Sequence, residues 1–95
     1  MEDKIELGGN IELNGFRDVG KAEMVVVRKV VGNYAKTMSE KNTSFSKLRV
    51  SMVKEGNNLK INAEMTAEKN YVGEEAGNNL FIALDSALKK IVNRL

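Results

Sequence analysis

Hydrophobic and polar residues alternate strictly along two neighbouring segments in the middle of the chain. The first segment, FSKLRVSMVK at residues 45–54, places its leucine, a valine and its methionine on one side. The second, LKINAEMTAE at residues 59–68, alternates in the same way, and Gly56 and Asn57 lie between the two. Alternation with a period of two indicates strands that are buried on one face, and a Gly-Asn pair suits a tight turn. The pattern therefore predicts a β-hairpin.

Two further segments have weaker strand patterns. KIELGGNIEL at residues 4–13 alternates at both ends around Gly8 and Gly9. We expect it to form one strand that bends or bulges at the glycines. KNYVGEEA at residues 69–76 follows the hairpin closely, so we expect it to add a third strand to the meander.

Apolar residues at helical spacing predict two helices. At about 100° per residue, one face of residues 15–40 collects Phe16, Val27, Val30, Val31, Tyr34 and Met38. Asn14 is expected to cap this helix. The second helix follows Asn78 or Asn79, either of which can serve as its N-cap. Its apolar side holds Leu80, Leu84, Ala87, Leu88, Ile91 and Leu95.

The expected order of elements, β-α-β-β-β-α, indicates the α+β class. Strands with one apolar face need a cover, and the two amphipathic helices provide it. We therefore expect a two-layer sandwich in which two helices pack on one face of a four-stranded mixed sheet. The first strand–helix–strand unit predicts a right-handed crossover, which makes strand one parallel to strand two. No linker or repeat interrupts residues 1–95, so we expect a single domain.

The composition excludes several kinds of chemistry. The 95 residues include no cysteine and no histidine, which removes disulfides, thiolate metal sites and the commonest general base. No run of about 18 apolar residues could span a membrane, and the acidic start MEDKIELGG has no apolar signal region. We therefore expect a cytoplasmic protein with no membrane partner, cofactor, metal or small-molecule substrate.

Candidate catalytic residues are few. Ser86 and Lys89 match a Ser-x-x-Lys spacing, in which a lysine can activate a serine, but the companion motifs are absent. Glu74 and Glu75 could pair as carboxylates, yet no other oxygen ligands stand at a defined spacing. Ordinary solvated positions explain all four residues, and without a nucleophile–base pair we predict that the protein is not an enzyme.

The distribution of charge is more informative than the net charge of +2. Residues 14–42 carry six basic and three acidic side chains, and residues 79–95 carry three basic side chains against Asp85. The candidate RNA-binding residues are Arg17, Lys21, Arg28, Lys29 and Lys36 on the first helix, and Lys89, Lys90 and Arg94 on the second. If both helices cover one side of the sheet, these residues form one basic surface, and such surfaces bind phosphate backbones. A merely solvated helix face is the alternative.

Both ends of the chain resemble one family. IELGGNIELNGF is similar to the start of the ribosome hibernation-promoting factors, or ribosome-associated inhibitors, with Asn14 in place of their capping threonine. EEAGNNLFIALDSALKKIVNRL is similar to their last strand, turn and helix, with Asn78 and Asn79 in place of an acidic pair. Lys90 falls on the lysine of the family's Asp-Lys-Leu motif, and Arg94 lies one position after its arginine.

The resemblance implies a fold and a function. Members of the family have the order β-α-β-β-β-α and bind the small ribosomal subunit through basic faces of both helices. They occupy the channel used by mRNA and tRNA, and so they block translation. Carried over to this chain, the resemblance implies that the eight basic residues contact ribosomal RNA. The chain ends without the second, dimerising domain of longer members, so it resembles a short, monomeric form.

Two other kinds of protein remain open on the sequence. A double-stranded-RNA-binding module has the related order α-β-β-β-α, but it places lysines at the start of the last helix, where this chain has NNLFIALDS. A small protein–protein interaction domain would use the open sheet face or an edge strand.

Overall fold

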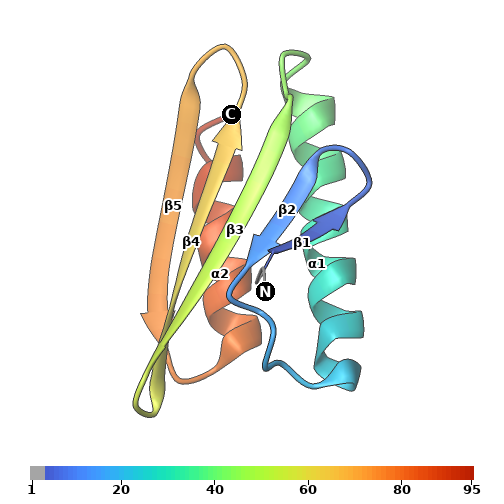
Figure 1. Ribbon diagram of the computed structural model, residues 1–95. Helices are drawn as coiled ribbons and strands as arrows, with labels where there is room; N and C mark the ends of the chain where they lie inside the picture. Colours follow the sequence, from blue (N-terminus) through green and yellow to red (C-terminus); the bar gives the residue numbers. More distant parts are fainter. Residues whose placement is uncertain (1–3) are drawn as a thin grey trace.

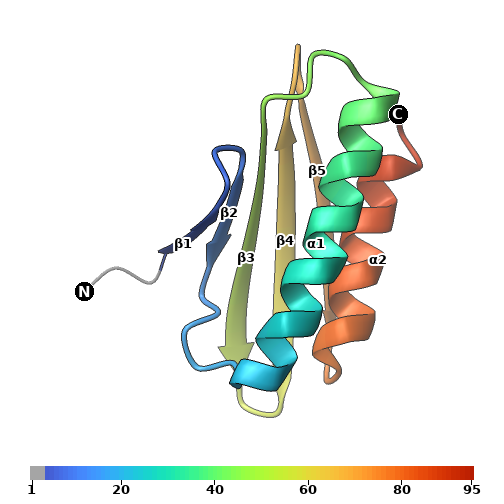
Figure 2. The same ribbon diagram turned by 90° about the vertical axis from the view of Figure 1, so that its right-hand side faces the viewer.

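The computed structural model describes residues 4–95, and residues 1–3 of the predicted domain lie outside that part. Two helices pack side by side on one face of a mixed sheet (Figures 1 and 2), which confirms the α+β class and the two layers. The elements are β1 (Lys4–Leu7), β2 (Ile11–Asn14), α1 (Lys21–Lys41), β3 (Lys47–Glu55), β4 (Asn58–Thr66), β5 (Asn70–Gly77) and α2 (Leu80–Val92).

The sheet has five strands in the order β1-β2-β3-β4-β5, so the prediction of four strands was wrong. The difference lies in the first segment, where β1 and β2 pair as an antiparallel hairpin rather than forming one bent strand. Gly8 has a φ of +65° in the connecting turn, a conformation that glycine adopts without steric cost. The alternation on both sides of the glycines was therefore the signature of two strands.

The first helix begins at Lys21 and not at residue 15. Gly15 has a φ of +84°, and a Cβ there would lie 2.1 Å from the carbonyl oxygen of Met52, so the chain makes a close, left-handed turn where the helix was expected to start. Phe16 is buried in the loop that follows. Asn14 does not cap the helix, because it belongs to β2 and its side chain donates a hydrogen bond to Glu12.

The rest of the sheet follows the predicted pattern. β2 runs parallel to β3, as the crossover predicted, and the β3–β4 hairpin turns at Gly56, which has a φ of +62°. β5 pairs antiparallel with β4 at the outer edge of the sheet. The inward side chains of the strands meet the apolar faces of both helices in one core, whose largest members are Phe16, Leu13, Met38, Leu48, Ile61, Met65, Leu84, Leu88 and Ile91.

The second helix lies unusually close to β5. Asn79 caps α2 by accepting hydrogen bonds from the backbone N–H groups of Phe81 and Ile82, as one of the two predicted caps. The contact is at Ala87, seven residues after the start of α2. A Cβ placed on Gly73 of β5 would lie only 2.2 Å from the carbonyl oxygen of Ala87. The absence of a side chain at Gly73 therefore allows the backbones of α2 and β5 to touch.

A polar contact also joins the two helices. The hydroxyl of Tyr34 on α1 donates a 2.6 Å hydrogen bond to the carboxylate of Asp85 on α2. Burial of the ring, followed by this bond to the nearby negative charge, raises the pKa of Tyr34 to about 12. A hydrogen bond to a charged acceptor is stronger than a neutral one, so the pair fixes the position of one helix against the other.

Substitution of Gly73 tests the close packing of α2 on β5. Gly73→Ala places a methyl group against the backbone of Ala87, which cannot rotate away, so we expect the free energy of unfolding to fall by about 1–3 kcal/mol. Gly77→Ala on the same strand is the matched control, because nothing lies within 4 Å of a Cβ there. Urea unfolding of both variants gives the two values. Equal stability of the variants would contradict the close contact.

Candidate nucleic-acid interface

Four cationic side chains on α1 form the candidate interface. Lys21, Arg28, Lys29 and Lys36 are all exposed. Within residues 4–95, no ion pair or hydrogen bond of the structure engages any of these four side chains. Their charges are therefore available to an external anion without the loss of an internal contact.

The four residues form two short rows along the helix. Lys21 and Arg28 are seven residues apart, and so are Lys29 and Lys36, which is a separation of about 10 Å along the axis in each row. Seven residues make nearly two full turns, so the members of a row point in almost the same direction. Charges spread over such a length suit the repeated phosphates of a nucleic-acid backbone better than one small anion.

Two of the other predicted residues lie outside these rows. Arg17 lies in the turn before α1 and not on the helix, because the helix starts later than expected. Lys89 is exposed on α2 and forms an ion pair with Asp85 at 3.6 Å, one helical turn away. Exposed pairs of this kind contribute little free energy, so Lys89 can still face a ligand beside α1.

The remaining two residues, Lys90 and Arg94, are turned toward the sheet. The ammonium group of Lys90 donates a 2.7 Å hydrogen bond to the carbonyl oxygen of Glu74 and lies 3.4 Å from the carboxylate of Glu75. The guanidinium group of Arg94 donates to the carbonyl oxygen of Val72. All three partners belong to β5. The structure thus separates these two cations from the rows on α1, although the sequence placed them on one surface.

Apolar side chains interrupt the basic surface of the helices. Val25 and Val26 on α1 are 63% and 42% exposed, and Ile82 on α2 is 66% exposed. Val25 lies one turn from Lys21, Arg28 and Lys29 along the helix. The outer side of the helix layer therefore combines positive charge with a few apolar contacts.

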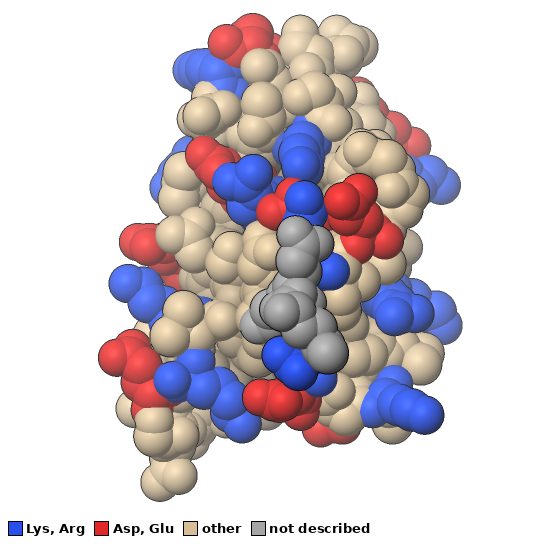
Figure 3. Space-filling view, in the orientation of Figure 1, with Lys and Arg blue, Asp and Glu red and all other residues tan. Residues whose placement is uncertain are grey.

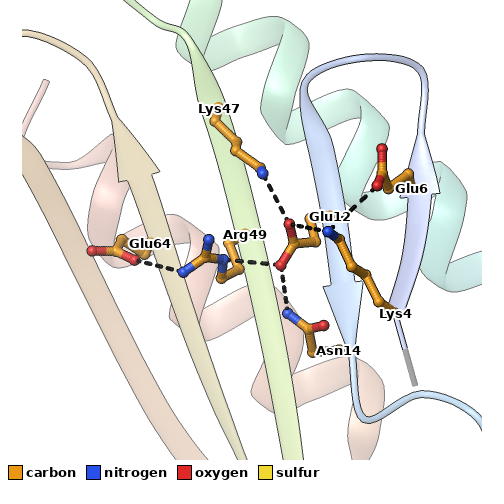
Figure 4. Close-up of polar contacts among 7 residues, drawn as sticks. All are labelled: Lys4, Glu6, Glu12, Asn14, Lys47, Arg49 and Glu64. Carbon is orange, nitrogen blue, oxygen red and sulfur yellow. Dashed lines mark hydrogen bonds and ion pairs between the residues drawn. The ribbon is translucent and has the colours of Figure 1, made fainter. Parts of the chain in front are cut away.

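The opposite face of the sheet carries charges of both signs (Figure 3). At its centre Glu12 of β2 is only 5% exposed, although it points away from the core. Its carboxylate lies 2.9 Å from the ammonium group of Lys47, 3.0 Å from Nε of Arg49 and 3.7 Å from the ammonium group of Lys4 (Figure 4). These ion pairs connect β1, β2 and β3, and the opposing charges leave this face without a predominant sign.

The same network shifts the pKa of Glu12. A hydrogen bond from Lys47, a 2.8 Å hydrogen bond from the amide of Asn14 and the charge of Arg49 outweigh the effect of burial and lower the pKa to about 2. Sequence reasoning did not find this cluster. The signal was an acidic residue at an outward position, but its partners are known only once β2 is paired with β3 in the observed register, which sets Glu12 opposite Arg49.

The candidate catalytic residues are not brought together. Glu74 and Glu75 point to opposite faces of β5, where Glu74 lies near Lys60 and Glu75 near Lys90. Lys89 turns to Asp85 and not to Ser86. Among residues 4–95, no group of three or more acidic side chains is placed to hold a metal ion.

A cleft of about 670 Å³ lies where the two helices begin. Its lining includes Asp18 and Glu23 from the α1 end and Lys54 from the β3–β4 hairpin. These charges are of both signs, and none of the four exposed α1 cations, Lys21, Arg28, Lys29 and Lys36, lines the cleft. None of the helices within residues 4–95 has the length and hydropathy to cross a membrane.

Comparisons with known proteins bear on the fold. No known family model matches the chain, and no curated protein matches it in sequence. Among solved structures, the chain is similar to a ribosomal subunit interface protein from Coxiella burnetii, with a TM-score of 0.65 over 90% of each chain and 9% sequence identity. The likeness shows a shared fold, and at that level it supports the resemblance predicted from the two ends of the sequence.

The Glu12 network predicts how stability depends on pH. Because the pKa of Glu12 in the folded protein lies below its ordinary value of 4.5, this carboxylate stabilises the fold above about pH 4.5, and the contribution is lost as the pH falls toward 2. We expect Glu12→Gln to lower the unfolding free energy at pH 7 and to flatten its decline below pH 5. Urea unfolding at a series of pH values measures both effects.

Glu6→Gln is the control for this prediction. Glu6 is an exposed carboxylate on the same face, 3.5 Å from the ammonium group of Lys4, so its removal causes the same change in net charge. If both variants altered the pH profile equally, overall charge and not the Glu12 network would account for the slope.

Proposed function

We propose that the protein is a non-enzymatic, ribosome-associated RNA-binding protein that binds the small ribosomal subunit and obstructs translation. The observation that carries the proposal is the set of four exposed cations on α1 without internal partners, Lys21, Arg28, Lys29 and Lys36. Lys89 on α2 is exposed as well, and its ion-pair partner Asp85 accepts a hydrogen bond from Tyr34 of α1. The ribosomal subunit interface protein of similar fold supports the choice of the ribosome as partner.

The mode of binding follows from the residues on this surface. Lysine and arginine side chains contact phosphates and release condensed counterions, which makes binding strongly dependent on salt. The described outer surface of the helices offers valine and isoleucine between its charges and no stacked aromatic rings, so the contacts are to the backbone and shape of the RNA and carry little sequence information. Translation is obstructed by occupancy and not by chemistry.

The two alternatives are less well supported. A double-stranded-RNA-binding module would need basic residues at the start of the last helix, but the first turn of α2 exposes Ile82 there. A protein partner is favoured by the exposed Val25, Val26 and Ile82. Binding that survives nuclease treatment and high salt would favour a protein over RNA.

Removal of two α1 cations tests the RNA surface. Lys29→Ala/Lys36→Ala should weaken binding to purified small subunits and reduce the slope of log K against log salt by about 2, since each lysine that contacts a phosphate contributes about 1. Cosedimentation with small subunits over a series of salt concentrations measures the slope. The same variant should inhibit a cell-free translation reaction less than the wild type does.

Lys54→Ala/Lys60→Ala is the matched control. It removes two positive charges from the β3–β4 hairpin, where Lys60 faces Glu74 on the open side of the sheet. We expect binding and slope close to those of the wild type. The proposal fails if the wild type does not cosediment at low salt, or if both double variants lose affinity equally.

A further inference from the structure

The sheet has two edges, and they differ in length. β1 forms one edge and has four residues, whereas β5 forms the other and has eight. An edge strand presents unpaired N–H and C=O groups to which another strand can add, and short edges are poor templates for this. β5, which lies at the outside of the sheet in Figure 1, is therefore the edge at which strand addition has to be prevented.

Two side chains, one from α2 and one from the turn after it, occupy this edge. Lys90 donates to the carbonyl oxygen of Glu74, and Arg94 donates to that of Val72. Carbonyl groups two residues apart point to the same side of a strand, and the bonds to Lys90 and Arg94 place these two on the outer side of β5, away from β4. The bonds lie in the middle of β5, where an added strand would need the same two acceptors.

The position of α2 brings the side chains of Lys90 and Arg94 within reach of the β5 edge. Ala87 touches β5 at Gly73, Lys90 follows about one turn later in α2, and Arg94 lies in the turn just after the helix ends at Val92. Glu75, which points to the helix side of β5, holds the ammonium group of Lys90 at 3.4 Å. The side chains thus reach around the edge from a helix that is fixed close behind it.

We propose that Lys90 and Arg94 cover the β5 edge and keep a second copy of this chain from adding to the sheet there. The added strand would come from a second copy of the chain. In a solution of the pure protein, the longest unpaired strand edge that β5 can meet is the β5 edge of another copy. Two such edges pair about a two-fold axis, which is the commonest symmetry of dimers. The assignment gives these two cations a role within the protein that is independent of RNA binding.

Removal of both side chains tests the proposal. Lys90→Ala/Arg94→Ala uncovers the two carbonyl groups, and we expect its average mass, measured by light scattering after size exclusion, to rise with concentration toward about twice that of the wild type. Glu74→Pro in the same background removes an outward N–H group from the edge, which an edge strand tolerates. We expect this third substitution to restore the mass of the wild type.

Lys29→Ala/Lys36→Ala loses the same net charge from α1 and should keep the mass of the wild type. The proposal is overturned if the edge variant and the wild type have equal masses at all concentrations, if the proline does not reverse the association, or if the α1 variant associates equally. Should the double variant not fold, as judged by circular dichroism, Arg94→Ala alone uncovers the carbonyl group of Val72 and carries the same test with a smaller shift, because Arg94 lies beyond the end of α2.

Discussion

The close contact between Gly73 of β5 and Ala87 of α2 is the constraint on which the arrangement of charges depends. Because residue 73 has no side chain, the helix backbone lies directly on the strand. The residues that follow Ala87 on that side of α2 are therefore carried to the edge of the sheet, where Lys90 and Arg94 find backbone acceptors. A wider spacing between helix and strand would leave both side chains in solvent.

The basic residues consequently fall into two groups with different physical situations. On α1 the cations are exposed and have no partner within residues 4–95, so an external phosphate meets charges that are already free. In the C-terminal segment, Lys90 on α2 and Arg94 just beyond it satisfy carbonyl groups of an edge strand, and a ligand that recruited them would leave those acceptors to water or to another strand. The resemblance to ribosome-binding proteins made no such distinction, because it compares residue types and not their partners.

Periodicity in the sequence was sufficient for most elements of the fold. Strict alternation located β3 and β4, and apolar spacing together with a capping asparagine located α2. The periodicity did not separate β1 from β2, because a bulged strand and a tight hairpin share the same alternation around Gly8 and Gly9. It also started α1 too early, since the fit of Gly15 against Met52 is a contact between distant segments. The roles of Glu12 and Lys90 depend on such contacts too, so no local pattern could reveal them.

Amine-reactive labelling of each lysine, read by mass spectrometry with and without small ribosomal subunits, tests the central claim most directly. The claim is that the cations of α1 meet the partner while those at the β5 edge serve the fold. It predicts that Lys29 and Lys36 lose reactivity when the subunit is bound, whereas Lys90 keeps the reactivity it has in the free protein. Protection of Lys90 with no change at Lys29 and Lys36 would contradict it.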